Sequence, residues 1–511
     1  MPVKWAKVID HESCIGCHAC TTACKSENEV PLSVTRTYVK YVDVGVFPQA
    51  RRTFQVTRCN QCEDAPCTTA CPTSAMYRRP DGIVDFDKTA CIGCKACIAA
   101  CPYDAIFINP EDHSAEKCNF CAHRLDVGLE PACAVVCPTE AIMVGDMNDP
   151  TSRVAQMVQR EPVAVRRPEK ETRPKLFYRG AHQATLDPLA ARRPDGGLFM
   201  WSEQQQGGHH VVSGHPGYGE GKAETAQGNS SAAALLSYDV AHTAPWDWRV
   251  SLYTLTKGIA AGAYLVPLLL VAFGVLPADS PLWTHAAPLL AGAFLAITGA
   301  LLIWDLEHPE RFYMIFTRPQ WKSWLVRGAF VIAGYSAVLA IHSFAGFSGQ
   351  NSILGPLMWP GLPLAAMTAV YTAYLFAQAK ARDMWQNPLL PPHLLVQCLL
   401  AGSAALLPIA RILEPSVVPA LLLLLGASSL LHLGMVVGEI SLPHGTAHAR
   451  LAVHEMVKGR FQGFFWGGLA LGAIGLLAPW IGIGIAVPAA LLGLLAFEHA
   501  YVQAGQSVPL A

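Results

Sequence analysis

Cysteine is the residue whose spacing in this sequence most clearly predicts chemistry. Sixteen of the 17 cysteines lie between residues 14 and 137, in four groups of four. The first and third groups share the spacing C-x2-C-x2-C-x3-C, the second widens the middle gap to four residues, and the fourth widens it to eleven. Thiolates at such short intervals are ligands for metal ions or iron–sulfur clusters. The groups are Cys14, Cys17, Cys20, Cys24; Cys59, Cys62, Cys67, Cys71; Cys91, Cys94, Cys97, Cys101; and Cys118, Cys121, Cys133, Cys137.

These spacings predict four 4Fe-4S clusters with all sixteen cysteines as ligands. Two-residue gaps let a tight loop place three thiolates around one face of a cubane, and the fourth thiolate, on the following helical turn, reaches the neighbouring cluster. A proline follows Cys71, Cys101 and Cys137, which is typical of such motifs, whereas Lys25 follows Cys24. Structural zinc is the alternative, because C-x2-C pairs also bind zinc, but the tight quartets do not have zinc spacing.

The motifs CIGCHACTTAC, CNQCEDAPCTTACP, CIGCKACIAACP and KCNFCAHRLDVGLEPACAVVCP follow one another in this order. They resemble the electron-transfer subunits of molybdopterin oxidoreductases, such as dimethyl sulfoxide, polysulfide and thiosulfate reductases. The resemblance covers residues 1 to about 180. It implies an α+β ferredoxin-like double module over residues 1–145 and a separate catalytic subunit that holds a molybdenum or tungsten bis-pterin cofactor.

The same resemblance implies that the first cysteine group pairs with the fourth and the second with the third. Spacing by itself leaves a sequential pairing open. Because each cluster would be fully ligated by thiolates, we expect a row of electron carriers with chemistry only at its two ends. The implied ligand sets are Cys14, Cys17, Cys20 with Cys137; Cys118, Cys121, Cys133 with Cys24; Cys59, Cys62, Cys67 with Cys101; and Cys91, Cys94, Cys97 with Cys71.

Residues 146–248 are predicted to form an extension and a linker. Prolines and arginines dominate residues 160–193, and glycine, histidine and serine dominate the stretch up to about residue 231, so this region cannot bury a core of its own. Residues 173–179 resemble a family segment that continues past the last cluster, and we expect them to be ordered against the cysteine domain or a partner. His209, His210 and His215 are possible metal ligands, but a linker that is solvated or docks on the catalytic partner explains them better.

Residues 249–511 contain eight apolar stretches, each near the length of about 20 residues that crosses a bilayer core of about 30 Å. The sequence therefore predicts an all-α, eight-helix transmembrane bundle after the α+β domain. The expected spans are residues 251–274, 283–303, 325–345, 361–380, 393–410, 417–437, 462–480 and 482–501.

Loop charges predict the orientation of this bundle. With a cytoplasmic N-terminus, nine basic residues fall in cytoplasmic loops, and the opposite side has only Arg411. The first residues contain no apolar export signal and no twin arginine. We therefore expect a multi-pass inner-membrane protein with both termini and the iron–sulfur domain on the cytoplasmic side. The nine residues are Arg311, Arg318, Lys322, Arg327, Lys380, Arg382, Arg450, Lys458 and Arg460.

Four segments of the bundle are similar to the NrfD-like membrane subunits of polysulfide-reductase type. They are KGIAAGA from residue 257, WDLEHPERF from residue 304, SWLVRGA from residue 323, and the stretch from Tyr371 to Trp385. The resemblance implies a quinone site near the cluster-bearing side and no haem. Among the histidines, His342 lies toward the far side, and only His432 with His499 could hold a haem. We expect packed or interfacial histidines instead.

Two buried positions are candidates for contact with quinone. Tyr371 lies about 13 Å inside the fourth expected helix. Its fourteen-residue spacing to Trp385 matches the family tyrosine that hydrogen-bonds quinone. Lys257 lies about two turns inside the first helix, where an ammonium group is costly unless it snorkels or finds a partner.

Asp305, Glu307 and His308 follow the second expected helix and are candidates for proton transfer between quinone and cytoplasm. The alternative is a headgroup-level cluster that pairs with Arg311. Cys398, alone in the fifth helix, is expected to be a small buried apolar residue and no iron ligand.

The sequence as a whole predicts a quinone-reactive electron-transfer subunit of a respiratory oxidoreductase, with membrane lipid, quinone and a molybdopterin-type subunit as partners. A sulfite-dehydrogenase-like catalytic subunit is favoured, because the iron–sulfur domain is expected in the cytoplasm. One alternative is a redox-driven proton-translocating module, suggested by Lys257, Asp305 and Glu439 in the bundle. Another is a non-catalytic anchor with a cluster-bearing head. A net charge of -1 gives no reason to expect nucleic acid.

Overall fold

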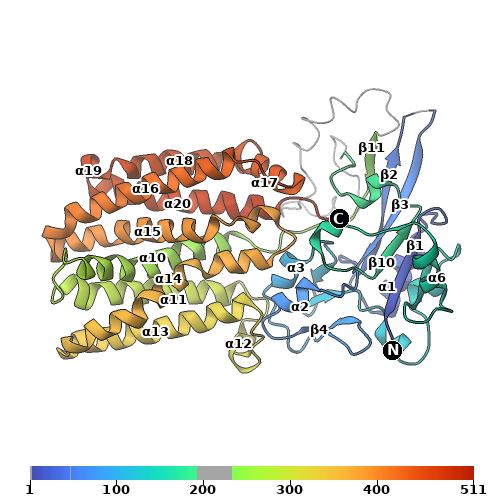
Figure 1. Ribbon diagram of the computed structural model, residues 1–511, viewed down its shortest axis with the longest axis horizontal. Coiled ribbons are helices and arrows are strands. Elements are labelled where there is room, and N and C mark those ends of the chain that lie inside the picture. The colour runs from blue at the N-terminus through green and yellow to red at the C-terminus, as the bar shows by residue number, and fades with distance from the viewer. Residues whose placement is uncertain (1–2, 47, 193–232) are drawn as a thin grey trace.

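The computed structural model describes residues 3–46, 48–192 and 233–511, and it has two parts (Figure 1). A cysteine-rich domain of short strands and helices contains the N-terminus, and a bundle of long helices extends from one side of it. The predicted α+β domain followed by a helical membrane domain is therefore present. His209, His210 and His215 lie outside the described residues.

Two sheets frame the cysteine-rich domain. In the first, β1 (Trp5–Asp10) is central, with β8 (Ile142–Asp146) antiparallel on one side and β10 (Leu176–Arg179) parallel on the other, and β9 (Val163–Ala164) follows β10. In the second, β2 (Thr37–Val44) pairs with β3 (Arg51–Arg58) and with β11 (Ala234–Tyr238). Their apolar faces supply the buried core beside the cysteines.

On the side of the domain next to the bundle, the chain twice forms a small unit in which a cysteine loop leads into a short helix, α2 or α3, and a two-stranded hairpin follows. The hairpins are β4 (Met76–Arg78) with β5 (Val84–Phe86), and β6 (Ile106–Ile108) with β7 (Ala115–Lys117). The repeat explains why the cysteine groups recur in sequence. The helices are α1 (Ala19–Glu27), α2 (Pro66–Ala70), α3 (Ala96–Ala100), α4 (Ala122–Leu125) and α5 (Ala132–Val135).

The segment after the last cysteine folds onto this domain. It contains α6 (Arg153–Arg160), the 3-10 helix η1 (Pro168–Lys170) and α7 (Gln183–Leu186), and β10 lies in register beside β1, with Phe177 opposite Val8. After the undescribed stretch, β11 adds to the edge of β2 before the chain enters the bundle. Residues 146–192 and β11 therefore belong structurally to the cysteine-rich domain.

The described bundle has seven helices long and apolar enough to cross a membrane. The eight-helix expectation is thus met only in part, because the seventh expected stretch forms the 15-residue helix α18 (Gln462–Leu476) and the short α19 (Ala478–Ile481). The seven spans are α10 (Trp248–Ala272), Leu282–Trp304 including α11 (Ala287–Trp304), α13 (Trp324–Ser348), Asn351–Gln378 including α14 (Leu354–Gln378), α15 (Leu390–Leu413), Pro415–Ser441 including α16 (Val418–Ser441) and α20 (Ile483–Gln506).

Proline and glycine explain where the helix boundaries differ from expectation. Pro479 has no backbone N–H to donate back into α18, so the helix ends before it at about 22 Å, short of a bilayer core of about 30 Å. Conversely, the fourth span begins ten residues earlier than expected, at Asn351, because Pro360 and Pro363 are accommodated inside α14.

Small residues bring the central helices into close contact. A Cβ atom on Gly262 of α10 would overlap the backbone of Cys398 and Gly402 in α15, and one on Gly402 would overlap Gly262. Gly468 of α18 and Gly493 of α20 approach each other in the same way. Such contacts between small residues are typical of membrane helix packing. They make α10 the buried centre of the bundle, packed against α11, α14, α15 and α20.

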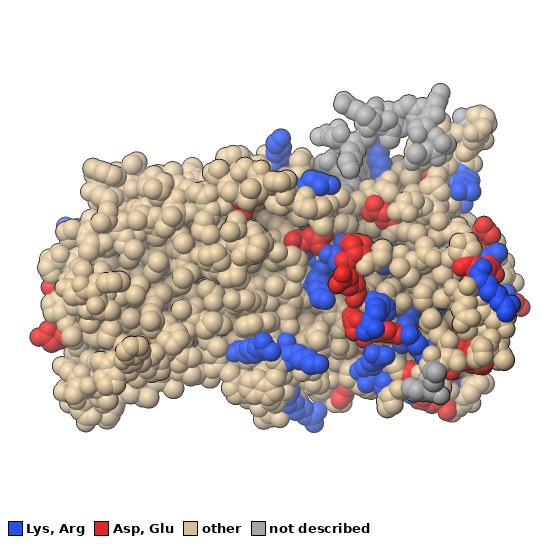
Figure 2. Space-filling model, viewed as in Figure 1, with Lys and Arg blue, Asp and Glu red and all other residues tan. Residues whose placement is uncertain are grey.

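Charged side chains are concentrated at one end of the bundle. Figure 2 shows this face of the helices almost free of lysine, arginine, aspartate and glutamate, except at the far tip and beside the cysteine-rich domain. The short helices α12 (Met314–Thr317) and α17 (Ala447–Val457) lie at the end next to that domain (Figure 1). This distribution is that of a membrane protein whose cysteine-rich domain stands outside the bilayer.

Candidate functional site

All four cysteine loops make the same tight turn. The residue two places after the leading cysteine has a positive φ in each loop: Gly16 at 68°, Gln61 at 48°, Gly93 at 70° and Phe120 at 67°. Glycine adopts this conformation without strain, and the loops held by Gln61 and Phe120 adopt it despite their side chains. The shared turn points the cysteines of each C-x2-C pair toward a common space.

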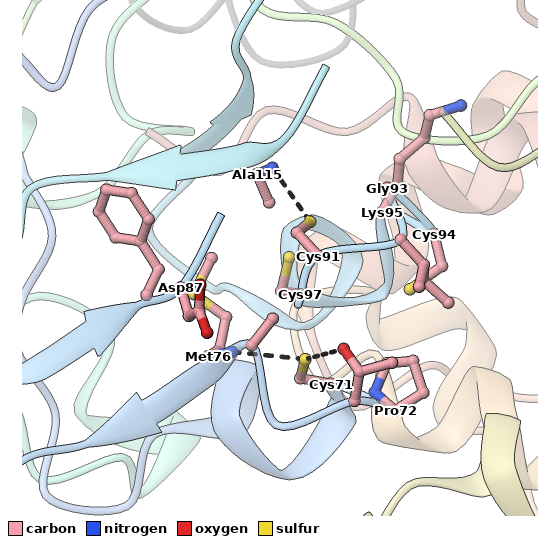
Figure 3. Close-up of a pocket in the computed structure, with 14 residues that line it drawn as sticks. Cys71, Pro72, Met76, Asp87, Cys91, Gly93, Cys94, Lys95, Cys97 and Ala115 are labelled. Carbon is pink, nitrogen blue, oxygen red and sulfur yellow. Dashed lines mark hydrogen bonds between the residues drawn. The ribbon is translucent and has the colours of Figure 1, made fainter. Parts of the chain in front are cut away.

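Three of these spaces are cavities of similar size, each lined by four cysteines. The cavity of about 360 Å³ is lined by Cys71, Cys91, Cys94 and Cys97, whose sulfur atoms surround it in Figure 3. Backbone N–H groups of Ala115 and Met76 donate to the sulfurs of Cys91 and Cys71, at 3.3 and 3.4 Å. The cavities of about 330 and 300 Å³ are lined by Cys14, Cys17, Cys20 and Cys137, and by Cys59, Cys62, Cys67 and Cys101.

The remaining four cysteines also lie together. The amide nitrogen of Asn28 lies 3.7 Å from the sulfurs of both Cys24 and Cys121. Burial raises the pKa of Cys24, and the neighbouring Cys118, Cys133 and Cys121 add to the rise. The structure thus brings together the four sets of cysteines that the family resemblance implies. Three sets each line one cavity and the fourth gathers around Asn28, and four thiols in one place fit a 4Fe-4S cluster.

Two cations distinguish Cys133 from the other thiols. Burial raises the pKa of Cys62 and Cys101 to about 12. Burial acts on Cys133 in the same direction, but Arg58 and Lys7 outweigh it and lower its pKa to about 7. Nη1 of Arg58 lies 2.9 Å from the Cys133 sulfur, and Nζ of Lys7 lies 3.8 Å from it.

The four sets form a row from the free end of the domain to the bundle. Cys14, Cys20 and Cys137 pack in the same buried cluster as Cys133, at the end that contains β1 and α1. The sets that contain Cys59 and Cys91 share a second buried cluster, and their helices α2 and α3 lie next to the bundle. Cys17 is exposed, whereas Cys94 is buried.

The loop of the third cysteine group, which contains Cys91 and Cys94, docks directly on the membrane domain. The backbone N–H groups of Glu307 and His308 donate to the carbonyl oxygens of Gly93 and Ile92, at 3.4 and 3.2 Å. A Cβ on Gly93 would overlap Glu307. Nη1 of Arg311 donates to the carbonyl oxygen of Cys91 at 3.0 Å. The segment after α11 therefore holds the cluster loop against the end of the bundle.

This docking changes the interpretation of the three predicted proton carriers. Glu307 forms an ion pair with Lys95 at 2.9 Å, and Nε2 of His308 donates to the carbonyl oxygen of Asp112 at 2.9 Å. The alternative pairing with Arg311 is wrong, because the ion pair that Arg311 makes is with Glu310, at 3.6 Å.

Asp305 differs from these two residues. Its Oδ1 is buried and has no hydrogen-bond partner in the described part of the chain, and burial raises the pKa of Asp305 to about 6 although Lys95 opposes the rise. Among the three, Asp305 therefore keeps a carboxyl group able to exchange protons near neutral pH.

An aromatic stack joins the cluster loop to the bundle. Nε1 of Trp246, just before α10, donates to the carbonyl oxygen of Cys94 at 3.2 Å. The Trp246 ring stacks on Trp385 at 5.5 Å between centroids, and Trp385 stacks on Phe376 of α14 at 4.6 Å. In the sequence Trp385 served only as a spacing marker for Tyr371, and the stack explains why a large aromatic residue is needed there.

Tyr371 and Lys257 are brought together inside the bundle. Nζ of Lys257 lies 5.1 Å from the centroid of the Tyr371 ring, and it donates to the carbonyl oxygen of Ala369 at 2.9 Å and to Oγ1 of Thr372 at 2.6 Å. Gly328 of α13 makes room for the Tyr371 ring, because a Cβ there would overlap it. Tyr371 lies about 10 Å inside the end of α14.

Glu498 of α20 belongs to the same interior and was not among the residues singled out in the sequence. It accepts a hydrogen bond at 2.8 Å from Oγ1 of Thr254, one turn before Lys257 in α10. The sequence did contain a signal for Glu498, because a carboxylate inside the eighth expected apolar stretch is costly unless it is paired.

A second buried polar group joins α15 to α16. Nε2 of His393 lies 2.8 Å from Nδ1 of His432, and Nδ1 of His393 lies 3.6 Å from Oε1 of Glu439. Asn387 donates to Glu439 at 2.7 Å. His432 and His499 were the one pair that the sequence allowed for a haem, and His499 packs on Phe464. The true pairing had a signal, because His393 and Gln397 occupy one helix face, as do His432 and Glu439.

His342 and Cys398 are buried in separate places. Nδ1 of His342 lies 3.0 Å from the Tyr264 hydroxyl, and its Nε2 lies 3.1 Å from the carbonyl oxygen of Trp283, to which it donates. Cys398 is fully buried in the apolar core of the bundle.

Comparison with known families agrees with this two-part architecture. Residues 238–495, just over half of the chain, match the family model described as polysulphide reductase, NrfD. This protein belongs to the NrfD family. Ahead of its NrfD region, residues 50–147 match a 4Fe-4S dicluster domain and residues 5–26 match a 4Fe-4S binding domain. This NrfD-family protein is therefore an iron–sulfur electron-transfer protein with a membrane domain.

Relatives of the iron–sulfur part of this NrfD-family protein are separate subunits. A polysulfide reductase subunit of Wolinella succinogenes is 43% identical over 35% of this sequence and 94% of its own length. A tetrathionate reductase subunit of Salmonella typhimurium is 41% identical over 39% of this sequence and 80% of its own length. A putative dimethyl sulfoxide reductase iron-sulfur subunit of Halobacterium salinarum is 37% identical over 37% of this sequence and 84% of its own length.

Proposed function

We propose that this chain carries electrons between a separate molybdenum or tungsten bis-pterin subunit and quinone in the membrane. Four 4Fe-4S clusters, when bound, supply one-electron transfer without an open position for substrate. Their ligands are the four cysteine sets described above. The names of the relatives, which are subunits of reductases for polysulfide, tetrathionate and dimethyl sulfoxide, support a catalytic partner of this class.

The observation that carries this proposal is the position of the cysteine set that contains Cys91, Cys94 and Cys97. The loop that contains Cys91 and Cys94 is hydrogen-bonded to the segment after α11 and to Trp246, directly at the end of the bundle. An electron that reaches this loop is therefore already beside the membrane domain, and the bundle needs to supply only an acceptor.

The first cysteine set suits contact with a catalytic partner. Cys17 is exposed, and apolar side chains surround this end of the domain: Ile15 is 57% exposed and Val135 is 58% exposed. Exposed apolar residues beside a redox centre are suited to docking another protein. We keep a sulfite-dehydrogenase-like partner on the cytoplasmic side as the preferred one, because of the nine-to-one bias of basic residues in the loops.

For the quinone site we propose Tyr371 as the hydrogen-bond donor to a quinone carbonyl, with Lys257 as the nearby positive charge. The ammonium group, 5.1 Å from the Tyr371 ring centroid, stabilises negative charge that develops on a quinone oxygen. Asp305 is the proposed proton donor at the cytoplasmic end. Glu307 and His308 hold the cluster loop and are assigned a positioning role.

Replacing Tyr371 with phenylalanine tests this site. Loss of one hydrogen bond to a developing charge is expected to slow quinone turnover about tenfold or more. Reduction of the clusters by the catalytic partner is expected to remain at the wild-type rate. Stopped-flow kinetics of the purified complex measures both steps.

Tyr374→Phe is the matched control, because Tyr374 lies on the same helix but stacks on Trp324 with a centroid distance of 4.4 Å. Its quinone kinetics should equal those of the wild type. Unchanged quinone kinetics in the Tyr371→Phe variant would remove Tyr371 from the site.

Proton translocation is a second candidate function, favoured by the buried group formed by His393, His432 and Glu439. Among the residues that the structure describes, Nδ1 of His393 and Oε2 of Glu439 are buried without hydrogen-bond partners, so the group has unused sites for protons. In liposomes, a His393→Gln variant should lower the number of protons moved per electron while quinone turnover continues. An equal ratio in variant and wild type would exclude this role.

A further inference from the structure

Two cations are buried in the cysteine-rich domain beside one sulfur atom. Arg58, the last residue of β3, is 1% exposed, and its Nη1 donates to the sulfur of Cys133 at 2.9 Å. Lys7, in β1, is 2% exposed, and its Nζ approaches the same sulfur at 3.8 Å. Both charges come from the strands that frame the domain and point to the same place.

Neither cation has a carboxylate partner among the residues that the structure describes. Nε and Nη2 of Arg58 are buried without any hydrogen-bond partner, and Lys7 otherwise lies 4.1 Å from the ring centroid of Phe120. Burying a cation without a counter-ion is costly, and an arginine cannot escape the cost by losing its proton. The geometry therefore requires an anion near the Cys133 sulfur.

A bound 4Fe-4S cluster with four thiolate ligands is such an anion. Other nearby cations are engaged elsewhere: Lys117 donates to the carbonyl oxygen of Cys118 at 3.3 Å, and Arg36 forms an ion pair with Glu116. Arg58 and Lys7 are the ones that face sulfur directly.

We propose that Arg58, reinforced by Lys7, raises the reduction potential of the cluster held by Cys24, Cys118, Cys121 and Cys133. This inference rests on the ligand sets of the proposed function. Reduction adds one electron and breaks no bond, and Arg58 keeps its proton, so the negative charge of the site increases by one. A fixed positive charge and a hydrogen bond to sulfur both stabilise the reduced form more than the oxidised form. Arg58 is thus a positioning residue that favours the reduced form of this cluster.

The test is a redox titration followed by electron paramagnetic resonance on the purified complex, with iron and sulfide counted in the same samples. In Arg58→Gln, the cluster held by Cys133 should show the largest fall in potential. The cluster that contains Cys20 should show a smaller fall, because Arg58 also acts on that sulfur, and the two clusters next to the bundle should stay unchanged. Arg58→Lys, which keeps the charge, should recover most of the shift. A purely structural role of Arg58 would not produce this recovery.

Arg52→Gln is the matched control. Arg52 lies on the same strand, about 20 Å away, and its replacement removes the same charge, but it pairs with Asp43 at 2.7 Å and its side chain is 49% exposed. The titration of this variant should equal that of the wild type. If Arg58→Gln loses four irons, its cluster is missing and its potential cannot be measured. The variant Lys7→Met then serves as the test, and its cluster potential should fall by a smaller amount.

Two outcomes separate this inference from the proposed function. Two results would overturn the role of Arg58 and leave the proposed function standing. One is full iron content in Arg58→Gln and Lys7→Met with titrations that superimpose on the wild-type titration, and the other is an equal shift in Arg52→Gln. A wild-type complex with fewer than four clusters would overturn the ligand sets, and the inference with them.

Discussion

Lys257 illustrates how single residues carry charge into an apolar bundle. A lone ammonium group at this depth is expensive, yet the carbonyl oxygen of Ala369 and the hydroxyl of Thr372 accept hydrogen bonds from it. The same contacts fix the ammonium group beside Tyr371, so stability and proposed chemistry depend on the same few atoms.

Cys398 provides a residue-scale prediction about cofactor content. It is fully buried and packed among apolar residues of α10 and α15, far along the sequence from the other sixteen cysteines. Replacing it with alanine should leave iron and acid-labile sulfide at the value for four clusters, about sixteen atoms of each. The loss of one small buried side chain should cost about 1 kcal/mol of stability or less.

Iron analysis and thermal unfolding measure these two effects. The variant Cys97→Ala is the contrasting control, because Cys97 lines a cavity with three other cysteines, and iron should fall there. A fall in iron for Cys398→Ala would make Cys398 a ligand and contradict the assignment.

At the scale of helices, α18 decides the topology of the bundle. It is too short to span a membrane by itself, but α17 lies at the end next to the cysteine-rich domain and α19 lies at the far tip (Figure 1). We therefore expect α18 and α19 together to cross the bilayer as an eighth span. The Gly-containing contact between α18 and α20 supports a crossing that is packed on protein.

Reporters fused at three positions test this path. Insertions near Gln350, between α13 and α14, and near Gly482, between α19 and α20, should behave as external. A fusion after Ala511 should behave as cytoplasmic. A cytoplasmic Gly482 with an external C-terminus would mean that α18 does not cross, and an external cysteine-rich domain would mean that the orientation is reversed.

At the scale of the whole molecule, the sequence predicted the features of short segments better than the contacts between distant segments. The cysteine spacing indicated the 4Fe-4S character of the first domain, and the apolar stretches indicated a membrane domain, because ligand loops and spans are both properties of short segments. Tyr371 and Lys257 were each predicted as a candidate for contact with quinone, but no pattern in the sequence showed that the Lys257 Nζ would lie 5.1 Å from the Tyr371 ring centroid.

What sequence could not predict depends on residues that meet across the fold. Arg58 and Cys133, His393 and Glu439, and Glu307 and Gly93 are each far apart in the sequence. The sequence did not indicate that Glu307 and His308 contact the cluster loop, because both lie far from Gly93 and Ile92 in the sequence. The break at Pro479 was missed because hydropathy averages over a proline that has little effect on the mean.

The junction between the two parts is made largely with main-chain atoms of the cluster-bearing domain. Carbonyl oxygens of Ala70, Pro72, Ile92, Gly93 and Cys94 accept hydrogen bonds from the membrane domain or the segment just before it. Carbonyl groups are present whatever the side chains are, so the surface of the first domain can diverge while the junction persists. This part of the junction therefore tolerates side-chain changes in the cysteine-rich domain, whereas the close approach of Gly93 to Glu307 and the ion pair of Lys95 with Glu307 do not.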